Sequence, residues 1–530
     1  MLGVVILIGA LLQLTRLPFR WSPVALAYAA YFHEFRHAIE LAGPLAAFST
    51  FVGLHPPAYS LVFLTLMEYR ATGLSWLACS ALFSLVSIPL VWWTARQGVR
   101  LQGSVMLGPA LLAGLVIAVS PHRNAYGLEV NNYPLLIGVT AAQLLCFARL
   151  FGESAGHNQL KGPAAWLNRD ELLWLMVTAL AIWTHLLSIA LPCAQLLLVI
   201  TLPETRQRTF RLLLLSSAVT AMCLPLSDEL LRGIASAPIN EAPGLTTALA
   251  AAVLELPGRY GSRYGAYLLI GLGLFGAARA LRLKPFRRIV PLSWLMHLVV
   301  AAGLILTMVS RGTAAAHQFP YYLVLLPSGA LLIGLNLAPG LGLRARRVAI
   351  ALTLLALALH ATDLGKEAHR GLQARSEAAL NYGLIETALD SWTPGSSLLL
   401  HGFPDYMDDD KDGLDAAFQL VPWNQRIHFG QPKVETLVPG DPNWGQPLQF
   451  ENQRWLYTFT SFEPSRVEAI TTAMHAQGRR VVVAAYDTQR GAREAEELKT
   501  WASRYGEPGR RAQGQLLFIL APPTTGLPSR

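Results

Sequence analysis

The stretch YPLLIGVTAAQLLCFARL, residues 133–150, has 18 residues and one charged side chain, Arg149. A helix needs roughly 20 mainly apolar residues to cross the hydrocarbon core of a bilayer, so this stretch predicts a transmembrane helix. Ten more apolar stretches lie elsewhere in the chain, at about 2–14, 75–95, 104–120, 171–185, 186–201, 211–226, 264–281, 291–309, 321–338 and 348–363. We therefore expect about eleven transmembrane helices.

The composition of the whole chain agrees with this expectation. Of 530 residues, 53% are hydrophobic and 14% are charged, whereas a soluble globular domain has about 25% charged residues. The net charge of +9 comes from basic residues in short loops between the apolar stretches, which argues against nucleic-acid binding. The four cysteines lie in or beside apolar stretches, so they do not indicate a disulfide scaffold.

The distribution of charge predicts how the chain crosses the membrane. With the N-terminus in the cytoplasm, the cytoplasmic loops hold sixteen lysines and arginines and the opposite loops hold nine, as the positive-inside rule requires. An odd number of spans then places the C-terminus outside. We expect a multi-pass protein of the inner (plasma) membrane with a periplasmic C-terminal domain.

The composition changes at about residue 366. Short apolar runs at 396–403, 479–487 and 514–522 predict strands, and the stretches 463–478 and 488–506 predict amphipathic helices. Alternating strands and helices are typical of a small α/β domain. We therefore divide the chain into a membrane domain, 1–365, whose first outer loop is 18–57, and a soluble α/β domain, 366–530.

Several motifs in the predicted outer loops share their order with a known family. They are HEFRH (33–37), HPPAY (55–59), SPHRNAYGLEVNNY (120–133), TH (184–185) and FPYYLVLLP (319–327). In this order and topology, residues 1–340 resemble the GT-C superfamily of membrane glycosyltransferases, including its protein-mannosyltransferase and aminoarabinose-transferase branches. The resemblance implies a GT-C-like fold and transfer of a sugar from a polyprenyl-phosphate donor to a lipid, glycan or protein acceptor on the outer face of the membrane.

The resemblance also implies roles for single residues. The family has an Asp-Glu pair in its first outer loop, and this chain has His33-Glu34 there, so Glu34, His33 and the later Glu129 are the candidate catalytic groups. Asn131 and Tyr321 stand where the family has arginines. A departing lipid phosphate needs cationic support, which adds arginines to the candidate substrate-binding residues. These are His55, Tyr59, Arg123, Tyr133, His185, Arg311 and Tyr322.

The HEFRH motif permits two other interpretations. On a helix, His33 and His37 lie on one face with Glu34 beside them, as in zinc peptidases, so a membrane zinc metallopeptidase is an alternative. The same three residues could instead hold a divalent cation (Mg, Mn or Zn) in a glycosyltransferase. A third alternative is a non-catalytic GT-C-like scaffold in envelope assembly, because the family's Asp and Arg are absent.

One acidic stretch in the soluble domain begins like a calcium loop. In DDDKDGLDAAFQ (408–419), Asp408, Asp410 and Asp412 alternate before Gly413, but Gln419 replaces the glutamate that completes such a site. A solvated acidic loop is therefore favoured over a calcium site.

Overall fold

The structure is a computed structural model, and it describes part of the chain. The described residues are 1–14, 58–59, 61–62, 73–98, 107–128, 131–151, 167–203, 206–227, 262–283, 285–310, 319–338, 342–366, 392–393, 396–401, 448–450, 454–459, 464–486, 500–501, 510–512 and 515–520. The chain forms two compact units: the first contains Trp76–Ala368 together with the N-terminal helix, and the second contains His369–Arg530.

Each of the eleven predicted apolar stretches is helical. The helices are α1 (Leu2–Leu14), α5 (Gly73–Gly98), α6 (Leu107–Val119), α8 (Tyr133–Phe151), α9 (Arg169–Thr184), η3 (Leu186–Ile189) with α10 (Ala190–Thr201), α11 (Arg206–Cys223), α14 (Arg263–Leu281), α15 (Pro285–Ser310), η9 (Phe319–Val324) with α16 (Leu326–Gly334), and Leu343–Lys366. Among the described residues, six helices are long and apolar enough to cross a membrane, and the others are shorter. The protein is therefore a multi-pass α-helical membrane protein.

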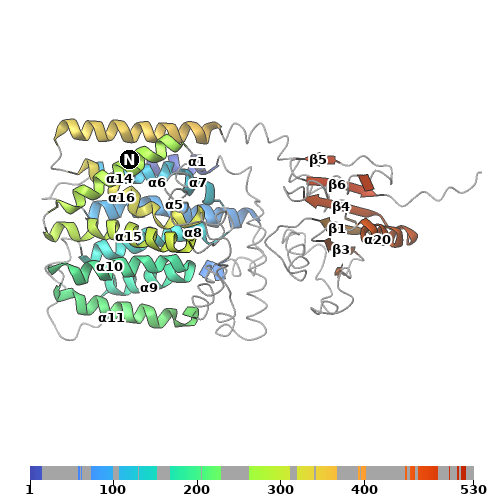
Figure 1. Cartoon of the computed structure of the whole chain (residues 1–530), viewed down its shortest axis with the longest axis horizontal. Coiled ribbons are helices and arrows are strands. Elements are labelled where there is room, and N and C mark those ends of the chain that lie inside the picture. Colours follow the sequence, from blue (N-terminus) through green and yellow to red (C-terminus); the bar gives the residue numbers. More distant parts are fainter. Residues whose placement is uncertain are drawn as a thin grey trace, which may run out of the picture. The chain divides into compact units, whose positions relative to one another are not determined.

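Burial distinguishes central from peripheral helices of this bundle. The apolar segment of α8 is 83% buried, and α8 contacts α9, α15 and α16. The apolar segments of α11, α14 and the helix Leu343–Lys366 are only 22–33% buried. Most of their apolar surface therefore faces outward, as expected for helices in contact with lipid. In Figure 1, α11 and the gold helix Leu343–Lys366 lie at opposite edges of the bundle.

Small residues allow some helices to approach one another closely. A Cβ atom on Gly276 of α14 would clash with the backbone carbonyl of Leu332 in α16. A Cβ atom on Gly138 of α8 would lie 2.8 Å from the carbonyl oxygen of Phe83 in α5. Such contacts between backbones are the usual way in which membrane helices gain packing energy, because the surrounding lipid supplies no hydrophobic drive.

A buried polar network joins α8, α9 and α10. The amides of Gln143 and Gln195 bond reciprocally, at 2.7 and 2.8 Å. Trp174 Nε1 donates to Gln195 Oε1 at 2.9 Å, and Gln143 Nε2 donates to Thr178 Oγ1 at 3.2 Å. All four side chains are fully buried. The network fixes the rotation of three helices, because a slip of one of them would leave buried amides without partners.

The second unit contains a mixed six-stranded sheet with the order β2-β3-β1-β4-β6-β5. Its strands are β1 (Ser397–His401), β2 (Leu448–Phe450), β3 (Arg454–Phe459), β4 (Val481–Tyr486), β5 (Arg510–Ala512) and β6 (Gln515–Leu520). Central β1 is parallel to β3 and β4, and the remaining pairs are antiparallel. Helix α20 (Pro464–Ala476) packs against β4.

The sheet confirms the three predicted strands, which are β1, β4 and β6, and adds β2, β3 and β5. Helix α20 confirms the prediction for 463–478, and Gly478 follows it with φ of +70°. This left-handed conformation after a helix end is the one that glycine adopts without strain. Of the second predicted helix, 488–506, the structure describes Thr500 and Trp501, which are helical.

Candidate functional site

The polar segment after α6 forms a short helix, α7 (Pro121–Tyr126). Ser120 caps its start, since its side chain accepts a hydrogen bond from the backbone of Arg123, and Pro121 occupies the first turn, where no backbone donor is needed. The sequence predicted an outward-facing polar loop here. The structure shows a helix in which Ser120, His122, Arg123, Asn124 and Tyr126 are all buried, and the side of the membrane stays a prediction.

Arg123 is fully buried and points toward the first helices of the bundle. One terminal nitrogen donates to the carbonyl oxygens of Gly9 (2.9 Å) and Ala118 (3.0 Å) and to Asn124 Oδ1 (2.6 Å). The other donates to Ser84 Oγ at 3.3 Å and Gln13 Oε1 at 3.5 Å. All five acceptors are neutral, and the Ala118 carbonyl lies at the C-terminal end of α6, where the helix dipole favours a cation.

These bonds define what Arg123 does in this structure. Burial lowers the pKa of its guanidinium to about 9, so the group is still a cation at neutral pH. Its terminal nitrogens are directed at α1, α5 and α6, and Gln13 Nε2 adds a bond to the carbonyl of Gly127 at 2.6 Å. The geometry therefore makes Arg123 an anchor for α7, with its terminal nitrogens directed at protein acceptors, whereas the sequence predicted that it would bind a substrate phosphate.

The other face of α7 carries aromatic side chains. His122 stacks on Tyr322 of η9 with ring centroids 6.2 Å apart, and Tyr126 meets Tyr133 of α8 edge-on at 5.4 Å. Tyr133 in turn lies 6.2 Å from the ring of His185. Positions 122 and 126 are one helical turn apart, so both rings lie on the same side of α7. Three predicted site residues, Tyr133, His185 and Tyr322, are thus brought together by α7.

Side-chain amides hold the start of α8 in place. The Oδ1 atom of Asn131 accepts a bond from the backbone nitrogen of Tyr133 at 3.0 Å, and Asn132 Nδ2 donates to the carbonyl of Thr184 at 2.9 Å. His185 caps η3, because its Nδ1 accepts from the backbone nitrogen of Leu187 at 3.2 Å. Asn131, which stands where the family has arginine, thus has a structural role here.

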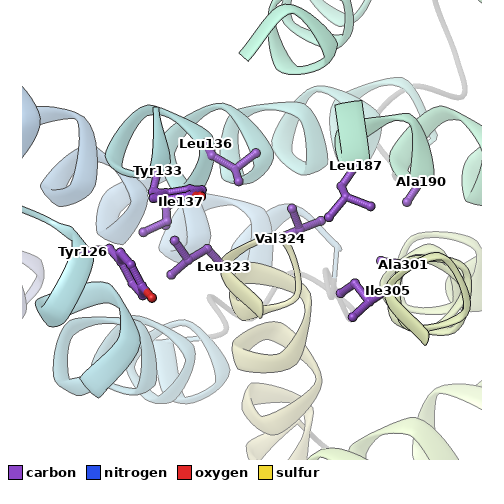
Figure 2. Close-up of a cluster of buried hydrophobic side chains, with 10 residues drawn as sticks. All are labelled: Tyr126, Tyr133, Leu136, Ile137, Leu187, Ala190, Ala301, Ile305, Leu323 and Val324. Atoms are coloured by element: carbon purple, nitrogen blue, oxygen red, sulfur yellow. The ribbon is translucent and has the colours of Figure 1, made fainter. Parts of the chain in front are cut away.

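An apolar cluster supports this group of aromatic residues. Its buried members are Tyr126, Tyr133, Leu136, Ile137, Leu187, Ala190, Ala301, Ile305, Leu323 and Val324. Figure 2 shows Leu323 beside Tyr126 and Ile137, and Val324 beside Leu187. Residues of six helical segments, α7, α8, η3, α10, α15 and η9, therefore fix the positions of the aromatic residues near α7.

Tyr59 lies beside α5. Its hydroxyl shares a 2.8 Å hydrogen bond with Ser80 Oγ, and its ring meets Phe83 edge-on at 6.5 Å. Ser84, the partner of Arg123, is one turn after Ser80. Tyr59 is thus on the Arg123 side of α7.

The remaining predicted site residues lie outside the described residues: His33, Glu34, His37, His55, Glu129 and Arg311, together with Asp408, Asp410 and Asp412 of the acidic loop. Within the part of the chain that the structure describes, no group of three His, Cys, Asp or Glu side chains could hold a metal ion. The predicted metal and calcium sites therefore stay predictions.

The sequence analysis missed His122 and Tyr126. A signal for them was present, because HRNAY places a histidine and a tyrosine at i and i+4 directly after a Ser-Pro helix start. Reading SPHRNAYG as a loop hid this helical spacing.

Comparisons with known proteins give the fold. No protein-family model and no curated protein matches the chain. Among solved structures, it is similar to apo ArnT from Cupriavidus metallidurans (14% identity, 93% of each chain, TM-score 0.51). It is also similar to the same protein bound to undecaprenyl phosphate (13%, 88% of each chain, 0.48).

A third similar structure is the Archaeoglobus fulgidus oligosaccharyltransferase tethered with an acceptor peptide. Its identity to this chain is 12%, its TM-score is 0.45, and the match covers 69% of this chain and 55% of that one. Of these three, the first has a TM-score above 0.5. The protein therefore shares the fold of ArnT.

Proposed function

We propose that the protein is a membrane glycosyltransferase, which moves a sugar from a polyprenyl-phosphate donor to a lipid, glycan or protein acceptor on the outer face of the membrane. The observation that carries this proposal is the meeting of Tyr133, His185 and Tyr322 around α7. They come from three segments far apart in the sequence, and all three are among the substrate-binding residues predicted from the sequence. The GT-C fold supports the same activity class, although a fold alone does not fix function.

The proposed reaction is a substitution at the anomeric carbon of the sugar. The acceptor hydroxyl oxygen bonds to that carbon, its proton passes to a base, and the bond from the carbon to the phosphate oxygen breaks. The carrier leaves as polyprenyl phosphate with one additional negative charge, which needs a cation nearby. Glu34, with His33 or Glu129, is the proposed base, and Arg311 is the proposed cation.

A divalent cation could share the phosphate-binding role. His33, Glu34 and His37 supply nitrogen and carboxylate ligands of the kind that Zn²⁺ accepts, and a bound cation would stabilise the departing phosphate electrostatically. We assign Arg123 a different task, since its bonds hold α7 against α1 and α6.

Burial separates the roles of the aromatic residues. Tyr133 and His185 are 5% and 0% exposed, so we propose that they position η3 and the start of α8. Tyr322 is partly exposed and stacks on His122, and we propose that it contacts the substrate. Aromatic rings suit the apolar faces of sugars and isoprene units.

The test is a transfer assay with the full-length protein in detergent. Undecaprenyl phosphate carrying aminoarabinose or mannose is incubated with the protein and a membrane lipid extract, and released undecaprenyl phosphate is measured by mass spectrometry. We expect release with the wild type, a loss of at least about 100-fold in kcat for Glu34→Gln, and about tenfold for Tyr322→Ala. Tyr264→Ala, at a tyrosine that is 76% exposed, is the matched control and keeps full activity.

The two alternatives give different results in the same preparation. Stoichiometric zinc, with peptide cleavage that Glu34→Gln abolishes, would establish the metallopeptidase. A wild type that releases no carrier phosphate, together with a Glu34→Gln strain that is indistinguishable from wild type, would establish the non-catalytic scaffold. We further propose that the protein resides in the inner membrane with its α/β domain in the periplasm, in line with the charge of its loops.

A further inference from the structure

One end of the bundle is strongly basic. Two short stretches, 279–288 and 344–347, contain eight lysines and arginines: Arg279, Arg282, Lys284, Arg287, Arg288, Arg344, Arg346 and Arg347. The sequence has no aspartate or glutamate from Tyr264 to Thr362. The local charge therefore has no acidic counterpart from these helices themselves.

The structure brings the two stretches together. Helix α14 packs against the helix Leu343–Lys366 in the antiparallel sense, because Gly265 at its start lies against Ala356 and His360. At the other end of α14, Arg279 Nη2 donates to the carbonyl of Ala338 at 2.6 Å, and Arg346 Nη2 approaches the same oxygen at 3.4 Å. Two guanidinium groups thus lie beside one neutral acceptor.

These arginines differ from other arginines of the bundle. Arg149 pairs with Asp170 at 2.8 Å, and Arg211 forms a two-pronged ion pair with Glu171. Arg279 donates to the backbone carbonyls of Leu335 and Ala338. The Nε atom of Arg346 is buried and has no hydrogen-bond partner among the described residues. Like charges held close together with a spare donor favour an anion as the missing partner.

The position of these residues indicates what kind of anion. The candidate spans Arg263–Leu281, Arg288–Thr307 and Leu343–Lys366 end or begin at this basic patch, which we define as Arg279, Arg282, Arg344, Arg346 and Arg347. Ends of transmembrane helices lie at the level of the lipid headgroups. Arg282, Arg344 and Arg347 are exposed there.

Exposed apolar side chains adjoin the patch. Leu281, Leu343 and Val348 are 60%, 64% and 56% exposed, and they neighbour the arginines in the sequence. An anionic phospholipid matches both features, because its phosphate would meet the arginines while its acyl chains cover the leucines and the valine. A soluble phosphate would use only the first feature.

We propose that the basic patch is a binding site for the headgroup of an anionic phospholipid, between α14 and the helix Leu343–Lys366. This site is separate from the residues around α7, and it does not depend on the proposed transferase activity. Its occupant neutralises the crowded guanidinium groups and holds the two helices together where they enter the membrane surface.

The experiment is a native mass-spectrometry titration of the purified full-length protein in a non-ionic detergent. Dioleoyl phosphatidylglycerol is the probe, and dioleoyl phosphatidylcholine is the neutral comparison. Each arginine near a membrane surface contributes about 1 kcal/mol to the attraction of an anionic lipid, so removing two weakens binding about 30-fold. We therefore expect the double variant Arg344→Gln and Arg347→Gln to raise the dissociation constant for phosphatidylglycerol about 30-fold; both side chains are exposed, so the fold is retained.

The matched control removes two exposed arginines elsewhere, through Arg169→Gln and Arg263→Gln, and should leave the dissociation constant unchanged. Equal losses in both double variants would mean that binding reflects total charge and would overturn the proposal. Equal binding of phosphatidylcholine would also overturn it. If glycerol 3-phosphate binds as tightly as phosphatidylglycerol, the ligand is a soluble phosphate and the assignment to a lipid is wrong.

Discussion

Replacing Arg123 by methionine tests whether this buried arginine anchors α7. Methionine keeps much of the side-chain length and removes every hydrogen bond of the guanidinium. Three of those bonds are short, to Asn124 Oδ1, Gly9 O and Ala118 O. The Ala118 carbonyl keeps a bond from Asn124 Nδ2 at 3.3 Å, so the substitution does not leave it without a donor.

The expected cost follows from these contacts. Hydrogen bonds to charged groups contribute about 1.5–3 kcal/mol each, but removing the arginine also relieves the desolvation of its charge. We take about 2 kcal/mol as the net loss in the free energy that keeps α7 docked. If the segment opens locally, its backbone amides should exchange hydrogen about 30-fold faster than in the wild type.

Hydrogen–deuterium exchange mass spectrometry of a peptide covering 120–128 measures this effect on the full-length protein in detergent. Arg263→Met is the control, since Arg263 is exposed at the start of α14 and should leave exchange in 120–128 unaltered. Exchange in Arg123→Met within threefold of the wild type would show that α7 is held by its aromatic face alone. The assigned role of Arg123 would then be wrong.

Two further predictions concern packing within the bundle. Gln143→Leu and Gln195→Leu should each lower the stability to unfolding in SDS, because each single change leaves the other amide without its partner. The double variant should lose less stability than the sum of the two single losses, with a coupling of about 1 kcal/mol in a double-mutant cycle. Additive losses would contradict the reciprocal pair. Gly276→Ala should lower the melting temperature by several degrees, because the added Cβ would clash with the Leu332 carbonyl. Gly271→Ala is the control and should leave the melting temperature unchanged, because no atom lies within 4 Å of the added Cβ. Equal melting temperatures of the two variants would disprove the close contact of α14 and α16.

Some features of the fold could be predicted because they depend on local composition. Long apolar runs must form helices in a bilayer, where every backbone polar group needs a partner within its own segment. Strands β1, β4 and β6 were visible because they are continuous apolar runs, as is typical of the buried centre of a mixed sheet. The strands β2, β3 and β5 are short or mixed in composition and lie toward the edges, so periodicity did not mark them.

The hydrogen-bond partners of the predicted site residues could not be predicted from local sequence. The polar residues of SPHRNAYG suggested contact with water, but Arg123 donates to protein acceptors, and one of them, the carbonyl of Gly9, lies 114 positions away in the sequence. No spacing rule in the sequence reports such acceptors. The family resemblance did select Tyr133, His185 and Tyr322, which the structure brings together, but only the structure supplied His122 and Tyr126 as the rings between them.

Backbone carbonyls stabilise the guanidinium groups of both Arg123 and Arg279, but the two arginines have different surroundings. Both are cations at helix ends whose acceptors are backbone carbonyls at or after a helix C-terminus, Ala118 for one and Ala338 for the other. Arg123 is fully buried and its acceptors come from four different elements, so binding another anion there would require breaking several bonds. Arg279 shares its carbonyl with Arg346 at the membrane surface, where two positive charges meet one neutral oxygen. The terminal nitrogens of Arg123 have five protein acceptors, whereas two guanidinium groups lie beside one neutral oxygen at Ala338. The fold therefore uses Arg123 to hold α7, and the patch around Arg279 is able to bind an anion.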